Sequence, residues 1–191
     1  RAEAERILSA AVELTDSAGV RHNLGKTRIL LGKYREAIEP LEKSLESAIQ
    51  NDDKFGASAA LIQIASAKYA LCDYDEACEI LQGIIEKEDD ESYNRAVALG
   101  KLGWIRALQC RYAEGKELLK SALEFHRTAG DMRERAVLSM CLNWCEYGIG
   151  DYEAAVTYAQ QARNEAKIVG EPYNESVAMM RIAKVRIAQG L

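Results

Sequence analysis

Apolar residues recur along the chain with the three- and four-residue spacing of amphipathic helices. Residues 74–88 carry one such set on a single helix face, formed by Ile80, Leu81, Ile84 and Ile85. A second helical pattern, residues 54–71, precedes it. Short polar segments rich in Asp, Asn and Gly separate consecutive patterns, as at residues 51–53 and 88–90. We therefore expect successive pairs of helices connected by tight turns.

The helix pairs repeat at a nearly constant interval. Related four-residue segments end at Tyr34, Tyr74, Tyr112 and Tyr152, which are 40, 38 and 40 residues apart. Residues 187–190 begin a fifth copy. A fixed period of this size predicts an all-α solenoid of antiparallel helix pairs. The expected repeat units are 1–19 (partial), 20–51, 52–90, 91–130, 131–170 and 171–191 (partial).

The repeated residues resemble the tetratricopeptide repeat (TPR) family. The pair Leu24-Gly25 matches the family's Leu-Gly in the first helix, and Ala77-x3-Leu81 matches its second-helix signature. The Gly-x-Tyr turn is similar as well, and the resemblance implies that the solenoid of helix pairs is right-handed. The chain departs from the family pattern at four positions. Ala65, Asn143 and Ala183 replace the glycine of the first helix, and Gly115 replaces the alanine of the second helix. Its period of about 40 also exceeds the family's usual 34.

Neither end of the array carries an evident polar cap. The chain begins in what reads as a second helix and stops where another second helix would begin. Solenoids normally cover their last apolar face. We therefore expect a fragment of a longer protein, or ends that pack on something else. The helix predicted over residues 172–189 should expose Val177, Met179, Ile182 and Val185 or cover them by self-association.

Composition narrows the classes of function. The chain is 48% hydrophobic and 29% charged, with a net charge of −5 and no basic tract, so nucleic acid is not an expected partner. No apolar run is long enough to span a bilayer, and we expect no membrane partner. The odd number of cysteines, five, favours free, buried thiols in a reducing compartment, consistent with a cytoplasmic protein.

Recognisable catalytic chemistry is missing from the sequence. We find no phosphate-binding loop, no nucleophile elbow, no zinc spacing and no metalloprotease motif. The two histidines, His22 and His126, are far in sequence from the Cys141-x3-Cys145 pair, and we expect His126 to be an exposed or helix-end residue rather than a catalytic one. The sequence therefore predicts that the protein is not an enzyme and uses no cofactor or metal.

The resemblance implies where a ligand would bind. In the family the first helices of the pairs line a concave face that usually holds the partner. The corresponding candidate residues are Lys26, Ser66, Tyr69, Lys101, Trp104, Met140, Trp144, Tyr147, Arg181 and Lys184. The two tryptophans share a register and should lie side by side, either in this groove or in the core between helices.

We accordingly predict a non-catalytic module that binds a protein or peptide through its concave groove. Aromatic, Met and Arg side chains of this kind are enriched at binding hot spots. Two alternatives stay open. One is a ligand-sensing regulatory domain of a transcription regulator or signal-transduction ATPase, which long repeats of this type also resemble. The other is an assembly scaffold.

Overall fold

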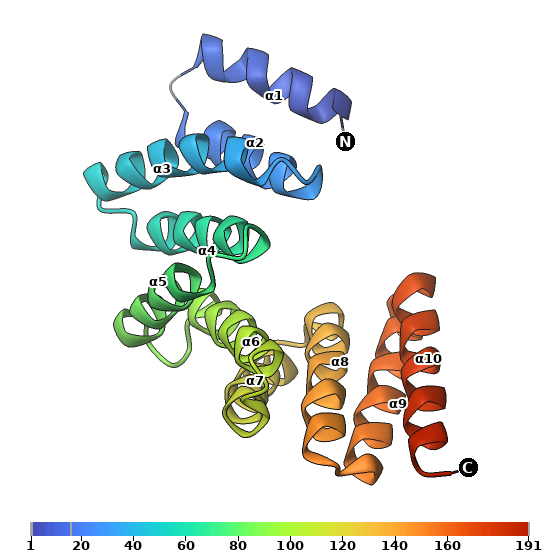
Figure 1. The fold of residues 1–191 in the computed structure, drawn as a ribbon. Helices are drawn as coiled ribbons and strands as arrows, with labels where there is room; N and C mark the ends of the chain where they lie inside the picture. Colours follow the sequence, from blue (N-terminus) through green and yellow to red (C-terminus); the bar gives the residue numbers. More distant parts are fainter. Residues whose placement is uncertain (1, 16, 191) are drawn as a thin grey trace. The chain divides into compact units, whose positions relative to one another are not determined.

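A computed structural model describes residues 2–15 and 17–190, which form ten helices joined by short turns (Figure 1). The helices are α1 Ala2–Leu14, α2 Ala18–Leu30, α3 Tyr34–Gln50, α4 Lys54–Ala70, α5 Tyr74–Lys87, α6 Tyr93–Leu108, α7 Tyr112–Thr128, α8 Met132–Ile149, α9 Tyr152–Ile168 and α10 Pro172–Ala188. The predicted all-α fold of sequential antiparallel helix pairs is confirmed. Each of the four turn tyrosines is the first residue of a second helix.

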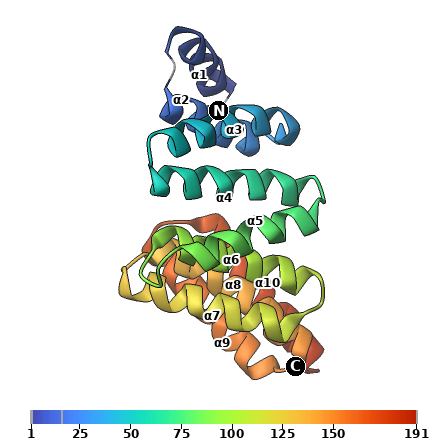
Figure 2. The same ribbon diagram turned by 90° about the vertical axis from the view of Figure 1, so that its left-hand side faces the viewer.

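The chain divides into two compact units, Arg1–Glu88 and Asp89–Leu191. In the first unit each helix packs on the next, and α2 also contacts α4. In the second unit α6 to α10 pack in order, and the first helices form their own row because α6 contacts α8 and α8 contacts α10. Figures 1 and 2 show this succession of layers within each unit. Side chains at equal register on α6, α8 and α10 are therefore neighbours.

Left-handed backbone ends the first helix of each complete pair. Gly32 and Gly150 take φ values of 76° and 94° at this turn, whereas Cys72 and Cys110 take the same position with φ of 67° and 61°. Both cysteines are exposed, so the prediction that all five thiols are buried in helices is wrong for these two. The reason is register, because the two cysteines replace the turn glycines and so lie outside the apolar stripe.

Acidic and hydroxyl side chains begin several helices. Asp53, Asp131 and Asp151 accept backbone N–H hydrogen bonds of 2.8, 3.1 and 3.0 Å at the starts of α4, α8 and α9. Ser92 does the same for α6. These contacts satisfy donors that a helix leaves free at its first turn. They explain why the polar segments between the repeats give well-defined helix starts.

Small residues allow the two helices of a pair to cross closely. A Cβ added to Gly25 would lie 2.4 Å from Leu41 Cγ, so this crossing of α2 and α3 requires glycine. The fourth pair uses a different solution at the equivalent position. Buried Asn143 donates a 2.8 Å hydrogen bond from Nδ2 to the backbone carbonyl of Ala155 across the α8–α9 crossing.

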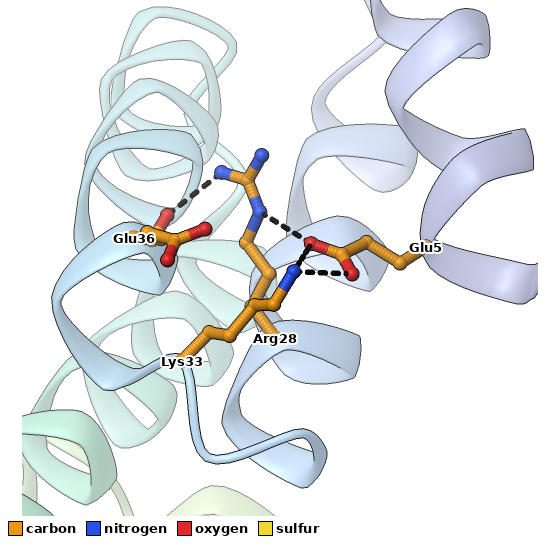
Figure 3. A network of polar contacts seen from close by, with 4 residues as sticks. All are labelled: Glu5, Arg28, Lys33 and Glu36. Carbon is orange, nitrogen blue, oxygen red and sulfur yellow. Dashed lines mark hydrogen bonds and ion pairs between the residues drawn. The ribbon is translucent and has the colours of Figure 1, made fainter. Parts of the chain in front are cut away.

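Ion pairs connect helices inside each unit. In the first unit, Glu5 on α1 accepts a 2.9 Å contact from Lys33 and lies 3.5 Å from Arg28 Nε, while Arg28 Nη1 donates to the Glu36 carbonyl at 2.7 Å (Figure 3). Because four groups from the α1, α2 and α3 region converge, this network fastens α1 to the first complete pair. Lys33 and Glu36 are exposed while Glu5 and Arg28 are half-buried, so solvent still screens these contacts and each contributes little stability.

His126 lies in the last turn of α7, as one of the two expected positions has it, but it is not exposed. Its side chain is 1% exposed, and its ring packs edge-on against Tyr93 at 5.6 Å and Phe125 at 5.3 Å. Its Nδ1 lies 3.6 Å from a carboxylate oxygen of Asp131, at the turn that leads into α8. The last turn of α7 thus folds inward against α6.

Helix α10 has an exposed face, but of the four residues predicted for it only Met179 is exposed, whereas Val177 and Ile182 are half-buried. Tyr173 is 79% exposed, Ile187 is 74% exposed, and Met179 and Met180 also face solvent. Val185, which we expected in this set, is buried. None of the helices in the described ranges is both long and apolar enough to cross a membrane.

Candidate functional site

Two tryptophans mark one face of the second unit. Trp104 comes from α6 and Trp144 from α8, and their ring centroids are 6.4 Å apart in an edge-to-face arrangement. Both side chains are partly buried, so they are neither fully enclosed core residues nor fully exposed surface residues. The structure therefore brings the two indoles together as their register indicates. We call the surface formed around them by α6, α8 and α10 the tryptophan face.

Two cations from α10 cover Trp144. The Arg181 Cζ atom lies 4.7 Å from the centroid of the Trp144 ring system, and Lys184 Nζ lies 5.4 Å from it. Lys184 Nζ is also 5.1 Å from the ring centroid of Tyr147, one turn further along α8. Cations at such distances are attracted to the negative face of an aromatic ring. Four sequence-predicted residues of α8 and α10 thus form one contiguous cluster, namely Trp144, Tyr147, Arg181 and Lys184.

These cations have no carboxylate partner among the described residues. Within residues 2–15 and 17–190, no Asp or Glu oxygen approaches Arg181 or Lys184 within 4.0 Å. The indole N–H of Trp144 also makes no hydrogen bond there, although the atom is buried. Among the described residues, this basic, aromatic cluster therefore has no internal anion. The cluster can therefore attract an anion from outside.

Lys101 and Trp104 open onto a pocket between α6 and α8. Its volume is about 340 Å³, and its walls are mostly apolar. The lining residues are Ala96, Val97, Gly100, Lys101, Trp104, His126, Glu134, Val137, Leu138 and Cys141. Burial lowers the pKa of Lys101, and the nearby Glu134 carboxylate opposes that effect. Burial raises the pKa of the Cys141 thiol to about 12, so this sulfur stays protonated and unreactive.

The remaining predicted residues divide into two groups. Met140 is partly buried on α8, one turn before Trp144. Lys26, Ser66 and Tyr69 belong to the first compact unit, where Lys26 is exposed on α2 and the Ser66 hydroxyl donates 2.7 Å to the Ile62 carbonyl of its own helix. That internal bond occupies the hydroxyl. The candidate site therefore lies within the second unit alone.

Tyr69 and Tyr147 have equivalent structural roles. The Tyr69 ring lies 5.8 Å from the ring of Tyr74, and the Tyr147 ring lies 5.6 Å from that of Tyr152, at similar interplanar angles of 53° and 48°. Each therefore stacks on the turn tyrosine of its own repeat. This repeated contact explains why an aromatic residue occupies the position in both units, independently of any ligand.

The sequence reasoning missed the α8 side of the pocket. Glu134, Val137 and Cys141 line it, and they precede Trp144 at helical spacings of three and four residues. That spacing could have identified these lining residues from the sequence, because it places all three on the same helix face as Trp144. No sequence pattern indicates that His126 also lines the pocket, because its position depends on how the end of α7 packs on α6.

Comparisons with known proteins agree with this architecture. A profile of the tetratricopeptide repeat family matches residues 59–90. No sequence relative was found among the curated proteins. Many solved structures share the fold, and three of them illustrate the range.

A putative kinesin light chain with nearly identical TPR-like repeats from Podosopora anserina has a TM-score of 0.69 at 18% identity, covering 89% of this chain and 85% of that chain. BtubC (BKLC) from P. vanneervenii has a TM-score of 0.69 at 16% identity, covering 99% and 90%. A MamA fragment from Desulfovibrio magneticus RS-1 has a TM-score of 0.56 at 16% identity, covering 90% and 94%. Together with the four registered repeats and their helix pairs, these matches show that the chain has a TPR-like fold, with a tetratricopeptide repeat recognised at residues 59–90.

Proposed function

We propose that the tryptophan face binds a segment of another protein that presents a carboxylate beside an apolar side chain. Repeat domains of this family are typically protein-interaction modules, and their stacked helices provide extended binding surfaces. The single observation that carries the proposal is the position of Arg181 and Lys184 over Trp144, with no carboxylate partner among the described residues. A ligand carboxylate would complete this arrangement.

Two physical arguments support a peptide with both features. A planar guanidinium held over an indole keeps its N–H donors directed sideways, where they can engage a carboxylate with two parallel hydrogen bonds. The indole edges and Met140 offer the apolar, polarisable contact area on which binding hot spots depend. A peptide that offers only charge would leave the aromatic area uncovered. One that offers only apolar groups would leave the cations unpaired.

A selection experiment tests this proposal. A random peptide library is selected on the 191-residue chain and counter-selected on the Arg181→Gln/Lys184→Gln variant. We expect the recovered peptides to share an Asp, a Glu or a free carboxyl terminus next to an apolar residue. Their affinity for the double variant should fall by about tenfold or more, since charge-assisted contacts of this type each contribute about 1.5–3 kcal/mol.

The matched control is Arg186→Gln. Arg186 is an exposed cation on the same helix, two residues beyond Lys184 and therefore on a different side of α10. This variant removes one positive charge from α10 but should bind the peptides as tightly as the wild type. The proposal is contradicted if the selected peptides carry no acidic group, or if Arg186→Gln weakens binding as much as the double variant.

The pocket beside Lys101 is the observation that favours the second candidate, a ligand-sensing domain. A half-enclosed cavity of about 340 Å³ with a few polar groups has the character of a small-molecule site. The charged and apolar groups of this pocket specify a ligand more narrowly than the open tryptophan face does.

A further inference from the structure

The pocket between α6 and α8 contains one positive and one negative side chain that do not pair with each other. Lys101 comes from α6 and Glu134 from α8, both are partly buried, and both line the cavity. Within the part of the chain that the structure describes, neither side chain has an ion-pair partner within 4.0 Å. Placing charges in a largely apolar cavity without partners is unfavourable. Glu134 acts on Lys101 only at a distance beyond 4.0 Å, so each of the two charges lacks a direct ion-pair partner.

We infer that this pocket binds a free α-amino acid with an apolar side chain. Such a zwitterion carries an ammonium for Glu134 and a carboxylate for Lys101 on one carbon atom. A ligand with a single charge would satisfy one side chain and leave the other unpaired in a low-dielectric setting. The inference does not depend on peptide binding at the tryptophan face.

The walls determine the kind of amino acid. Val97, Val137 and Leu138 offer aliphatic surface, and the Trp104 ring closes one side. These contacts favour an apolar or aromatic side chain, because burying its surface in the cavity removes it from water. A small polar side chain would instead lose its hydrogen bonds to water without replacement. The volume of about 340 Å³ is at the lower end of small-molecule sites, which suits a ligand of amino-acid size.

The state of Lys101 agrees with an anionic ligand. Its amine is held at a lowered pKa because burial disfavours the charged form, and Glu134 only partly offsets this effect. A bound carboxylate would stabilise the ammonium directly. The Cys141 thiol is protonated at neutral pH and has no part in this recognition beyond forming the wall.

Calorimetric titration of the 191-residue chain provides the test. The ligands are L-phenylalanine and L-leucine, with N-acetyl-L-phenylalanine lacking the ammonium, L-phenylalanine amide lacking the carboxylate, and L-serine lacking the apolar group. We expect saturable binding of at least one of the two parent amino acids. Each analogue of phenylalanine should bind about tenfold more weakly or not at all, as the loss of one charged contact implies.

Protein variants assign each charge to its partner. Lys101→Met should weaken the parent amino acid by about tenfold yet leave the affinity for the amide unchanged, because the amide no longer engages Lys101. Glu134→Gln should behave in the same way toward the N-acetyl analogue. The exposed residues Lys167 and Glu153 on α9 supply the controls, and Lys167→Met and Glu153→Gln should bind like the wild type.

Each contrary result has a clear meaning. If neither parent amino acid binds the wild-type chain at any soluble concentration, the inference is wrong. The inference is equally wrong if N-acetyl-L-phenylalanine or L-phenylalanine amide binds as tightly as L-phenylalanine, because the pocket then does not require both charges of the ligand. The analogue comparison uses only the wild-type protein, so a variant that fails to fold does not affect it. Failure of peptide binding in the selection experiment leaves this result untouched.

Discussion

At the scale of single residues, one register position shows how the repeats vary while their packing is preserved. Arg28, Lys68 and Arg106 occupy this position in the first three complete pairs, and each contacts the following helix near a glutamate. In the fourth pair the position is Glu146, which is only 2% exposed. Its partner is Lys116 on the preceding α7, with an N–O distance of 2.8 Å. In the fourth pair the first helix therefore carries the acidic residue instead of the basic one, and its partner lies on the preceding helix instead of the following one.

This exchange makes Lys116 a sensitive residue. Lys116→Met should destabilise the second unit by about 3–5 kcal/mol, because it leaves the buried Glu146 carboxylate without a cation. The double variant Lys116→Met/Glu146→Met should recover much of that loss. Chemical denaturation of the three proteins measures both effects. Equal stability of Lys116→Met and the wild type would show that Glu146 does not depend on this partner.

The same pair defines a pH dependence. Hydrogen bonding to Glu146 raises the pKa of Lys116 above its ordinary value of 10.5, so folding favours the protonated amine. The stabilisation is fully present at neutral pH and is lost as the pH rises through the raised pKa. The difference in unfolding free energy between the wild type and Lys116→Met should therefore shrink above about pH 10.5. A difference that stays constant into that range would contradict the assignment.

Small residues give a second prediction at this scale. Ala155 is fully buried where α8 crosses α9, and its carbonyl accepts the Asn143 side chain. Ala155→Leu should cost about 1–3 kcal/mol, because the crossing has no space for the added carbons. Ala113→Leu on exposed α7 surface is the matched control and should leave the melting temperature nearly unchanged. Equal melting temperatures for all three proteins would mean that the crossing is looser than described.

At the scale of helices, the pattern of the sequence predicted most elements but not all of their environments. Periodicity identified the helix pairs, the turn tyrosines and the juxtaposition of Trp104 with Trp144, because these follow from local spacing and register. The burial of His126 depends on contacts with Tyr93 and Asp131, which are distant or across a turn, and local pattern does not contain them. The pocket likewise exists only because α6 and α8 pack together.

The exposed face of α10 yields a prediction about association. Tyr173, Met180 and Ile187 present apolar surface to solvent in the 191-residue chain. Exposed apolar patches favour self-association, so light scattering should show a mass that rises with concentration. Met180→Lys/Ile187→Lys should reduce that rise. A monomeric wild type over the whole concentration range would show that the patch is too small or too divided to drive association.

At the scale of the whole molecule, the structure has a boundary between two compact units that the repeat pattern of the sequence does not predict. The repeats keep their interval across Glu88 and Asp89, where the chain divides into two compact units. The predicted binding residues are distributed over both units, yet the aromatic and cationic cluster forms within residues 89–191 alone. This concentration makes the second unit the part of the molecule on which the functional proposal depends.

The Trp144→Ala variant tests that proposal most directly, through affinity and melting temperature measured on the same protein. If Trp144 anchors an acidic peptide from the selection, its truncation should weaken binding by about 2 kcal/mol or more. The partly exposed ring should cost less unfolding free energy than the roughly 3–5 kcal/mol of a fully buried tryptophan. A stability loss of that full size with unchanged peptide affinity would make Trp144 a core residue and contradict the binding face.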